Sequence, residues 1–119
     1  PVLVPHYDIN SAVMQKIKAL SGRTVVQARD IFDLYLLSPR YLTGKTKKHA
    51  LMEKGVFRKA YENIFEVGFE VFRDAVIVYL SVDDQPVYGN PSAWEEIRLR
   101  VAGFINQLEK EYEQHFHSV

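Results

Sequence analysis

The sequence predicts a mainly α domain, a bundle of about five helices. Apolar residues recur along most of the chain at the spacing of one helix face, and short links with glycine, proline or capping residues separate these stretches. Near the N-terminus, Val2-Leu3-Val4 is typical of the end of a strand, and we interpret it as a short N-terminal strand remnant. With 119 residues and a hydrophobic fraction of 47%, the chain can bury a core of its own, so we expect a single helical domain over residues 1–119.

The first two predicted helices are joined by a glycine turn. Either Asn10 or Ser11 caps the first helix, which ends near Gly22. The second helix spans about residues 24–37 and is closed by Ser38-Pro39, because the residue before a proline is pushed out of helical geometry. A turn at the glycine would fold the two helices into a hairpin. We expect this hairpin to pack against the fourth and the last helix.

The rest of the chain predicts three further helices. Ser92-Ala93-Trp94-Glu95 is a capping-box signature and marks the start of the last one. Residues 76–80 alone would also fit a buried strand. We expect a third helix over residues 50–66 with an interruption at Gly55, a fourth over 69–80, a turn-rich link over 83–91, and a last helix that carries its apolar face to Tyr112.

Two carboxylates lie among apolar residues on the second predicted helix. Asp30 and Asp33 fall within one turn of each other and have valine and leucine neighbours, whereas solvent-facing carboxylates usually have polar ones. This pattern predicts a partly buried pair whose ionisation needs support from cations or a metal. On the first helix, Lys16 lies beside the apolar stripe, and Arg23 returns to the same side seven residues later. The hairpin would bring both cations toward Arg29, Asp30 and Asp33.

The same residues carry a resemblance to a known family. Lys16 opens the spacing K-x-x-A-L, Arg23 follows three residues after the leucine, and Arg29 opens the spacing R-D-x-x-D-L-Y. In this order, the motifs resemble the middle-to-C-terminal motifs of the AbiEii-type nucleotidyltransferase toxins, a branch of the DNA polymerase β-like nucleotidyltransferase superfamily. Stretches between residues 76 and 101 look like the closing helices of that family, so the resemblance covers nearly the whole chain.

The resemblance implies an enzyme that transfers a nucleotide from an NTP to a tRNA or similar acceptor with the help of Mg²⁺, and that acts as a toxin beside a cognate antitoxin. In such an enzyme, Lys16, Asp30 and Asp33 would belong to the catalytic site, with Asp30 serving as a base, an orienting group or a support for a metal ligand. Lys16 would contact the triphosphate, and Arg23 and Arg29 would steady phosphates or Asp33. Mg²⁺ and NTP are therefore the cofactors expected for the full-length enzyme.

The residues that hold the metals in this superfamily are missing from the chain. The family carries a Gly-Ser or Gly-Gly-Thr turn and a D-x-D strand pair, and neither occurs in the sequence. The chain therefore resembles the C-terminal half of a nucleotidyltransferase without the N-terminal catalytic half, inactive alone and with no cofactor of its own. It begins at Pro1 rather than Met, which fits a piece cut from a longer enzyme, and a short natural homologue that has lost this half is the alternative.

The two halves of the chain carry opposite charge. Residues 1–59 hold eleven Lys and Arg against four Asp and Glu, whereas residues 60–119 hold four against eleven, giving +7 and −7. A basic cluster after the second helix would suit a phosphate backbone, such as the acceptor arm of a tRNA. This leaves a rival hypothesis, a non-catalytic helical interaction or nucleic-acid-binding module. The basic residues concerned are Arg40, Lys45, Lys47 and Lys48.

Composition excludes several other classes of protein. The absence of cysteine excludes a disulfide framework and a thiolate metal site, and we expect no metal site in this chain, since His115 and His117 have no third ligand at a fixed spacing. No apolar run approaches the ~18 residues of a membrane span, and no signal-peptide pattern opens the chain. We therefore expect a cytoplasmic protein without a membrane partner.

Overall fold

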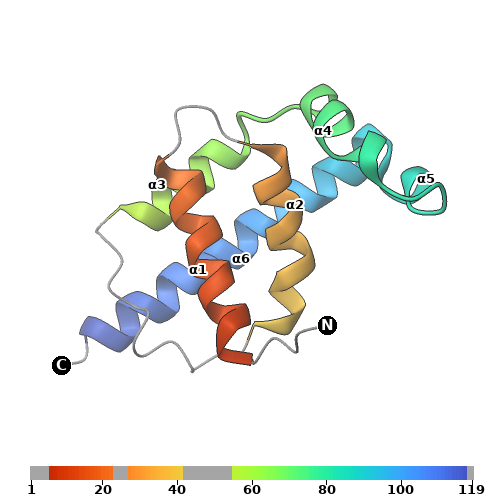
Figure 1. Ribbon diagram of the computed structural model, residues 1–119. Helices are drawn as coiled ribbons and strands as arrows, with labels where there is room; N and C mark the ends of the chain where they lie inside the picture. The colour runs from red at the N-terminus through yellow and green to blue at the C-terminus, as the bar shows by residue number, and fades with distance from the viewer. Residues whose placement is uncertain (1–5, 23–26, 42–54, 118–119) are drawn as a thin grey trace.

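The computed structural model describes residues 6–22, 27–41 and 55–117, and every regular element in these ranges is helical (Figure 1). The mainly α fold predicted from the sequence is confirmed, whereas the expected strand remnant Val2-Leu3-Val4 lies outside the described residues. No helix in these ranges is both long and apolar enough to cross a membrane. The elements are α1 (His6–Gly22), α2 (Ala28–Leu37), the 3₁₀ turn η1 (Ser38–Arg40), α3 (Val56–Ile64), α4 (Phe69–Ala75), the 3₁₀ turn η2 (Ile77–Tyr79), α5 (Gln85–Tyr88) and α6 (Pro91–His117).

Helix α6 is the axis on which most of the other helices pack. In Figure 1 it runs behind α1 and α2, and it contacts α2, α3, α4 and α5. Helices α1 and α2 lie side by side, as expected for the hairpin, but they pack on different neighbours. Helix α1 lies mainly against α3, whereas α2 lies against α4 and α6. The short α4, η2 and α5 lie together at one end of the molecule, near the start of α6 (Figure 1).

A stacked aromatic pair holds the start of α6 against α4. The rings of Phe72 and Trp94 are nearly parallel, with centroids 4.0 Å apart, and both side chains are buried. Trp94 Nε1 donates a hydrogen bond to the carbonyl oxygen of Val67 at 2.9 Å, and Arg98 donates to the same oxygen at 3.1 Å. Because Val67 lies between α3 and α4, this one carbonyl attaches the link between them to α6.

Helix α2 ends at Leu37, as predicted, but the chain does not leave helical geometry at Ser38-Pro39. Ser38 keeps helical torsion angles (φ −56°, ψ −39°), and α2 tightens into η1. Pro39 has no N–H for the carbonyl of Tyr35, four residues earlier, but the hydroxyl of Ser38 donates to that oxygen at 3.2 Å. The serine therefore supplies the hydrogen bond that the proline lacks, and the turn continues to Arg40.

Two helix starts also differ from the prediction. Helix α1 begins before Asn10, which is a buried residue within the helix rather than its cap. Helix α6 is capped by Asn90, whose Oδ1 accepts the backbone N–H of Ala93 at 2.9 Å. Pro91 explains the shift, because its fixed φ suits the first helical position and so places the cap two residues before the predicted Ser92.

The third helix is interrupted at Gly55, as expected, and ends two residues earlier than predicted, while residues 50–54 lie outside the described residues; the fourth helix is shorter than predicted. Gly55 has a φ of +90°, a left-handed conformation that favours glycine, and α3 begins at the next residue. The fourth helix ends at Ala75, because Val76 takes non-helical angles (φ −125°, ψ −56°), and both Val76 and Ile77 are buried. The predicted link over residues 83–91 contains the short α5.

Asn63 on α3 caps the C-terminal end of α1. Its side chain is buried, and Nδ2 donates to the carbonyl of Leu20 at 2.7 Å, one of the last α1 carbonyls, which have no partner within the helix. We predict that Asn63→Leu lowers the free energy of unfolding by about 1–3 kcal/mol, because the buried Leu20 oxygen loses its donor. Urea denaturation of the chain measures this change. Asn106→Leu, at an exposed position on α6, is the control, and equal losses in the two variants would contradict the cap.

Candidate functional site

Lys16 lies between two carboxylates of the neighbouring helix. Its Nζ, on α1, is 3.1 Å from Oδ1 of Asp30 and 2.9 Å from Oδ2 of Asp33, both on α2. The contact between α1 and α2 thus brings together the three charges that the sequence singled out as a catalytic group. We refer to Lys16, Asp30 and Asp33 as the charge cluster.

The charge cluster is closed on its Asp30 side and open at its rim. The side chain of Asp30 is 3% exposed, whereas those of Lys16 and Asp33 are 32% and 27% exposed. Leu36, one turn after Asp33, is an exposed large apolar residue, and most of the other exposed large apolar residues lie in the segment 71–87. Leu36 thus adds an exposed apolar group one turn from Asp33.

The other predicted site residues are either exposed or outside the described residues. Arg29 is exposed on α2 and, among the described residues, makes no ion pair with Asp33, which instead pairs with Lys16 from the neighbouring helix. The role of Arg29 in steadying phosphates or Asp33 therefore stays a prediction for the full-length enzyme. Arg40 is exposed at the end of η1. Four further predicted residues lie outside the described residues, namely Arg23, Lys45, Lys47 and Lys48.

The described residues do not form a metal site by themselves. In the ranges that the structure covers, no group of three or more His, Cys, Asp or Glu side chains is placed to hold a metal ion. Both carboxylates of the charge cluster face Lys16, whose positive charge would compete with a cation. Asp33, the more exposed of the two, could add one oxygen to a metal held mainly by other residues.

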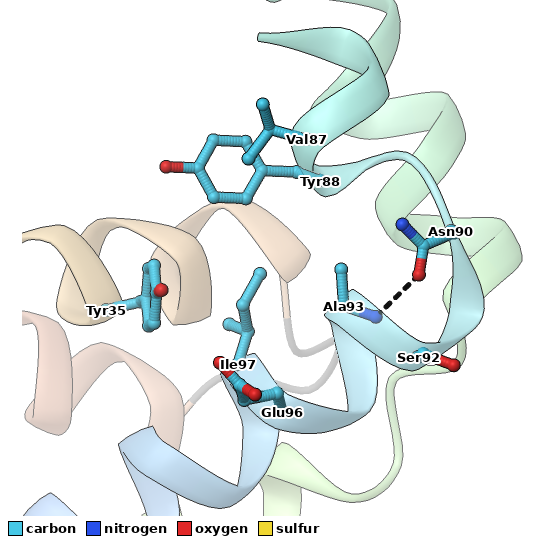
Figure 2. Close-up of a pocket in the computed structure, with 8 residues that line it drawn as sticks. All are labelled: Tyr35, Val87, Tyr88, Asn90, Ser92, Ala93, Glu96 and Ile97. Atoms are coloured by element: carbon cyan, nitrogen blue, oxygen red, sulfur yellow. Dashed lines mark hydrogen bonds between the residues drawn. The ribbon is translucent and has the colours of Figure 1, made fainter.

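A hollow that the sequence did not indicate lies between α2, α5 and the start of α6 (Figure 2). Its volume is about 300 Å³, and Tyr35 and Tyr88 meet there almost at right angles, with ring centroids 6.4 Å apart. Tyr35 falls in the second predicted helix and Tyr88 in the predicted link over residues 83–91, and no local spacing connects them. Only the packing of α5 beside α2 brings the two rings together.

A family comparison identifies the chain. The family model described as nucleotidyl transferase AbiEii toxin, type IV TA system, matches residues 1–118. The chain belongs to the AbiEii nucleotidyltransferase toxin family. The resemblance drawn from the motifs at Lys16, Arg23 and Arg29 is thereby confirmed. Comparisons with curated proteins and with solved structures gave no significant match.

The two carboxylates control the protonation of Lys16 in this AbiEii-family domain. Partial burial is the largest single influence and lowers the pKa of Lys16, but hydrogen bonds and charges from Asp33 and Asp30 together outweigh it, so the pKa is raised above its ordinary value. Lys16 is therefore a cation at neutral pH. An ammonium group has three N–H donors, and two of them serve the two carboxylates. The third donor remains for an anion that approaches the open side of the charge cluster.

Double-mutant cycles should separate the two ion pairs. We predict a coupling free energy of about 1.5–3 kcal/mol between Lys16 and Asp30, because the buried carboxylate depends on its charged donor. The coupling between Lys16 and Asp33 should stay below about 1 kcal/mol, since water reaches both groups. Urea denaturation of Lys16→Met, Asp30→Asn, Asp33→Asn and the two double variants gives both values. A stronger coupling to Asp33 than to Asp30 would be inconsistent with the burial of the cluster.

The raised pKa of Lys16 predicts a loss of stability in alkali. The unfolded chain releases this proton near pH ~10.4 and the folded chain at a higher pH, so the stability from the charged Lys16 is fully present below the unfolded pKa and is lost as the pH rises through the folded pKa. We predict that the difference in unfolding free energy between the natural chain and Lys16→Met is constant between about pH 7 and 9 and shrinks above about pH 11. Lys18→Met, at an exposed position, controls for general effects of alkali. A difference that grows with pH would refute the sign of the shift.

Proposed function

We propose that this domain is the C-terminal half of a nucleotidyltransferase and that the charge cluster lies at the nucleotide-binding site, which an N-terminal catalytic half completes. The observation that supports this best is the convergence of Lys16 with Asp30 and Asp33 at a surface that stays partly open. Nucleotidyl transfer requires cations beside a triphosphate, and a lysine held by two carboxylates is a cation in a fixed position. Membership of the AbiEii family supports the same class of reaction.

Each residue of the charge cluster has its own role in this proposal. Lys16 contacts the triphosphate through the N–H that the carboxylates leave available. Asp30 is a positioning residue, because its burial keeps it away from substrate while it holds the Lys16 ammonium group in place. Asp33, at the rim, is the carboxylate that can reach substrate or a metal ligand. Arg23 and Arg29 would add positive charge that steadies the phosphates.

The proposed reaction transfers a nucleotide from an NTP to a tRNA or similar acceptor. When bound, Mg²⁺ would neutralise charge on the phosphates, and its ligands would come mainly from the N-terminal half. The domain alone would therefore be inactive, and the complete enzyme would act as a toxin in the cytoplasm beside a cognate antitoxin. The domain would contribute the held cation, which lowers the barrier by positioning charge rather than by covalent chemistry.

A second candidate function rests on the exposed basic residues. Arg40, Arg58 and Lys59 are exposed, and with the basic segment after η1 they would suit a nucleic-acid backbone without any chemistry. In that case the charge cluster would only join α1 to α2. The two functions therefore differ in whether the charge cluster is needed for nucleotide transfer.

We predict that Lys16→Ala or Asp30→Asn in the full-length enzyme abolishes nucleotide transfer, by at least about 100-fold, because the first removes the cation at the triphosphate and the second releases it from its position. Lys18→Ala, on the same helix but exposed, should retain transfer. Assays with labelled NTP and tRNA, run beside thermal melts, measure activity and folding separately.

The Asp30→Asn enzyme also separates positioning from stability. If Asp30 acts through Lys16, any residual activity should show a raised KM for NTP as well as a lowered kcat. A role in stability alone would reduce the amount of active enzyme and leave KM unchanged. Near-normal transfer in the substituted enzymes, or a loss explained by unfolding, would favour the nucleic-acid-binding function instead.

A further inference from the structure

The hollow between α2, α5 and α6 has aromatic walls that meet at a corner. The rings of Tyr35 and Tyr88 make an interplanar angle of 82°, and Figure 2 shows Ala93 and Ile97 of α6 on the side that faces them. Phe32 supports Tyr88 edge-on, with ring centroids 5.2 Å apart. A flat ring that enters this corner would stack on one tyrosine and meet the other edge-on, which are the two favoured aromatic geometries.

The rim of the hollow offers both a hydrogen-bond donor and an acceptor. Asn90 uses its Oδ1 for the backbone N–H of Ala93, so the orientation of its amide is fixed and its Nδ2 remains a donor. Glu96, one turn into α6, supplies a carboxylate, which only accepts hydrogen bonds. Its ion pair with Arg100, at 3.4 Å between largely exposed side chains, is weak. A flat ligand with an amino group and a ring acceptor would satisfy this rim, whereas a purely apolar ligand would not.

A second hollow adjoins the first at Tyr35, and its lining includes the side chain of an arginine. Its volume is about 390 Å³, and Arg100 lines it together with Phe104 and Gln107 of α6. Glu96 lines the first hollow and Arg100 the second, one turn later on α6, so an acceptor and a cation lie next to each other along the two hollows. A ligand whose flat ring occupies the first hollow could therefore direct an attached phosphate toward Arg100.

We infer that the first hollow binds a nucleobase, with its phosphate toward Arg100, and that it prefers bases with an amino group over uracil. Adenine, cytosine and guanine can each donate an exocyclic amino N–H to Glu96. The only base N–H of uracil in a nucleotide, N3–H, lies between two carbonyl oxygens that a carboxylate repels, so uracil fits this acceptor less well. This inference rests on the proposed function, because an NTP and an RNA acceptor are the two sources of bases in that reaction. The pocket would hold the base of one of them.

Titration of the chain with mononucleotides, followed by two-dimensional ¹H–¹⁵N NMR, tests the pocket. We expect AMP, CMP and GMP to shift the amide signals of Val87, Ala93 and Ile97 saturably, and UMP to bind at least about 5-fold more weakly. Glu96→Gln, at an exposed position, should bring this ratio close to one, because an amide both donates and accepts. Equal binding of all four nucleotides by the natural chain, or shifts located elsewhere, would overturn the inference.

A second variant and a second set of ligands test whether binding occurs in this pocket and which molecule supplies the base. Ala93→Leu fills the hollow from α6 without adding a charge, and it should abolish the shifts while the rest of the spectrum stays folded. ATP and an RNA trinucleotide should compete for the pocket. The ligand that binds more tightly identifies the source of the base. If neither ligand binds, the proposal is overturned. Lys16→Ala should keep AMP binding in the pocket, so a failure of the charge cluster and a failure of the pocket give different results.

Discussion

The burial of Asp30 beside Lys16 is the constraint on which the arrangement of α1 and α2 depends. A carboxylate that is 3% exposed is costly without a cation, and Lys16 supplies that cation from the neighbouring helix. This pairing fixes how the two helices face each other, and it leaves Lys16 and Asp33 at an accessible rim. The ion pairs between α1 and α2 therefore also form the charge cluster that we assign to the reaction.

Features with a local signal in the sequence were predictable, and features that depend on distant residues were not. The apolar faces gave the helical fold, and two aspartates among valine and leucine indicated the pair that Lys16 neutralises. The end of α2 at Leu37 is confirmed, but the chain goes on as a 3₁₀ turn instead of leaving helical geometry, because the hydroxyl of Ser38 replaces the donor that Pro39 lacks. The pocket was missed entirely, because Tyr35 and Tyr88 are related only through the packing of α5 against the rest of the fold.

Helix α2 connects the two sites that we propose. Asp33 belongs to the charge cluster, and Tyr35, two residues later, separates the two hollows beside α6. The charge cluster, proposed for a triphosphate, and the aromatic corner, proposed for a base whose phosphate lies toward Arg100, thus both include residues of this one rigid helix. The α2 helix is held in turn by α1, α4 and α6, so the positions of both sites depend on the packing of the bundle.

The most direct test of the central claim is a crystal structure of the full-length enzyme with a non-hydrolysable NTP. We expect Nζ of Lys16 within about 2.7–3.2 Å of a phosphate oxygen, with Asp30 still beside it and away from the ligand. If the nucleotide binds elsewhere and the charge cluster is covered only by protein side chains, Lys16 has no role in binding the triphosphate, and the cluster serves only to hold α1 against α2.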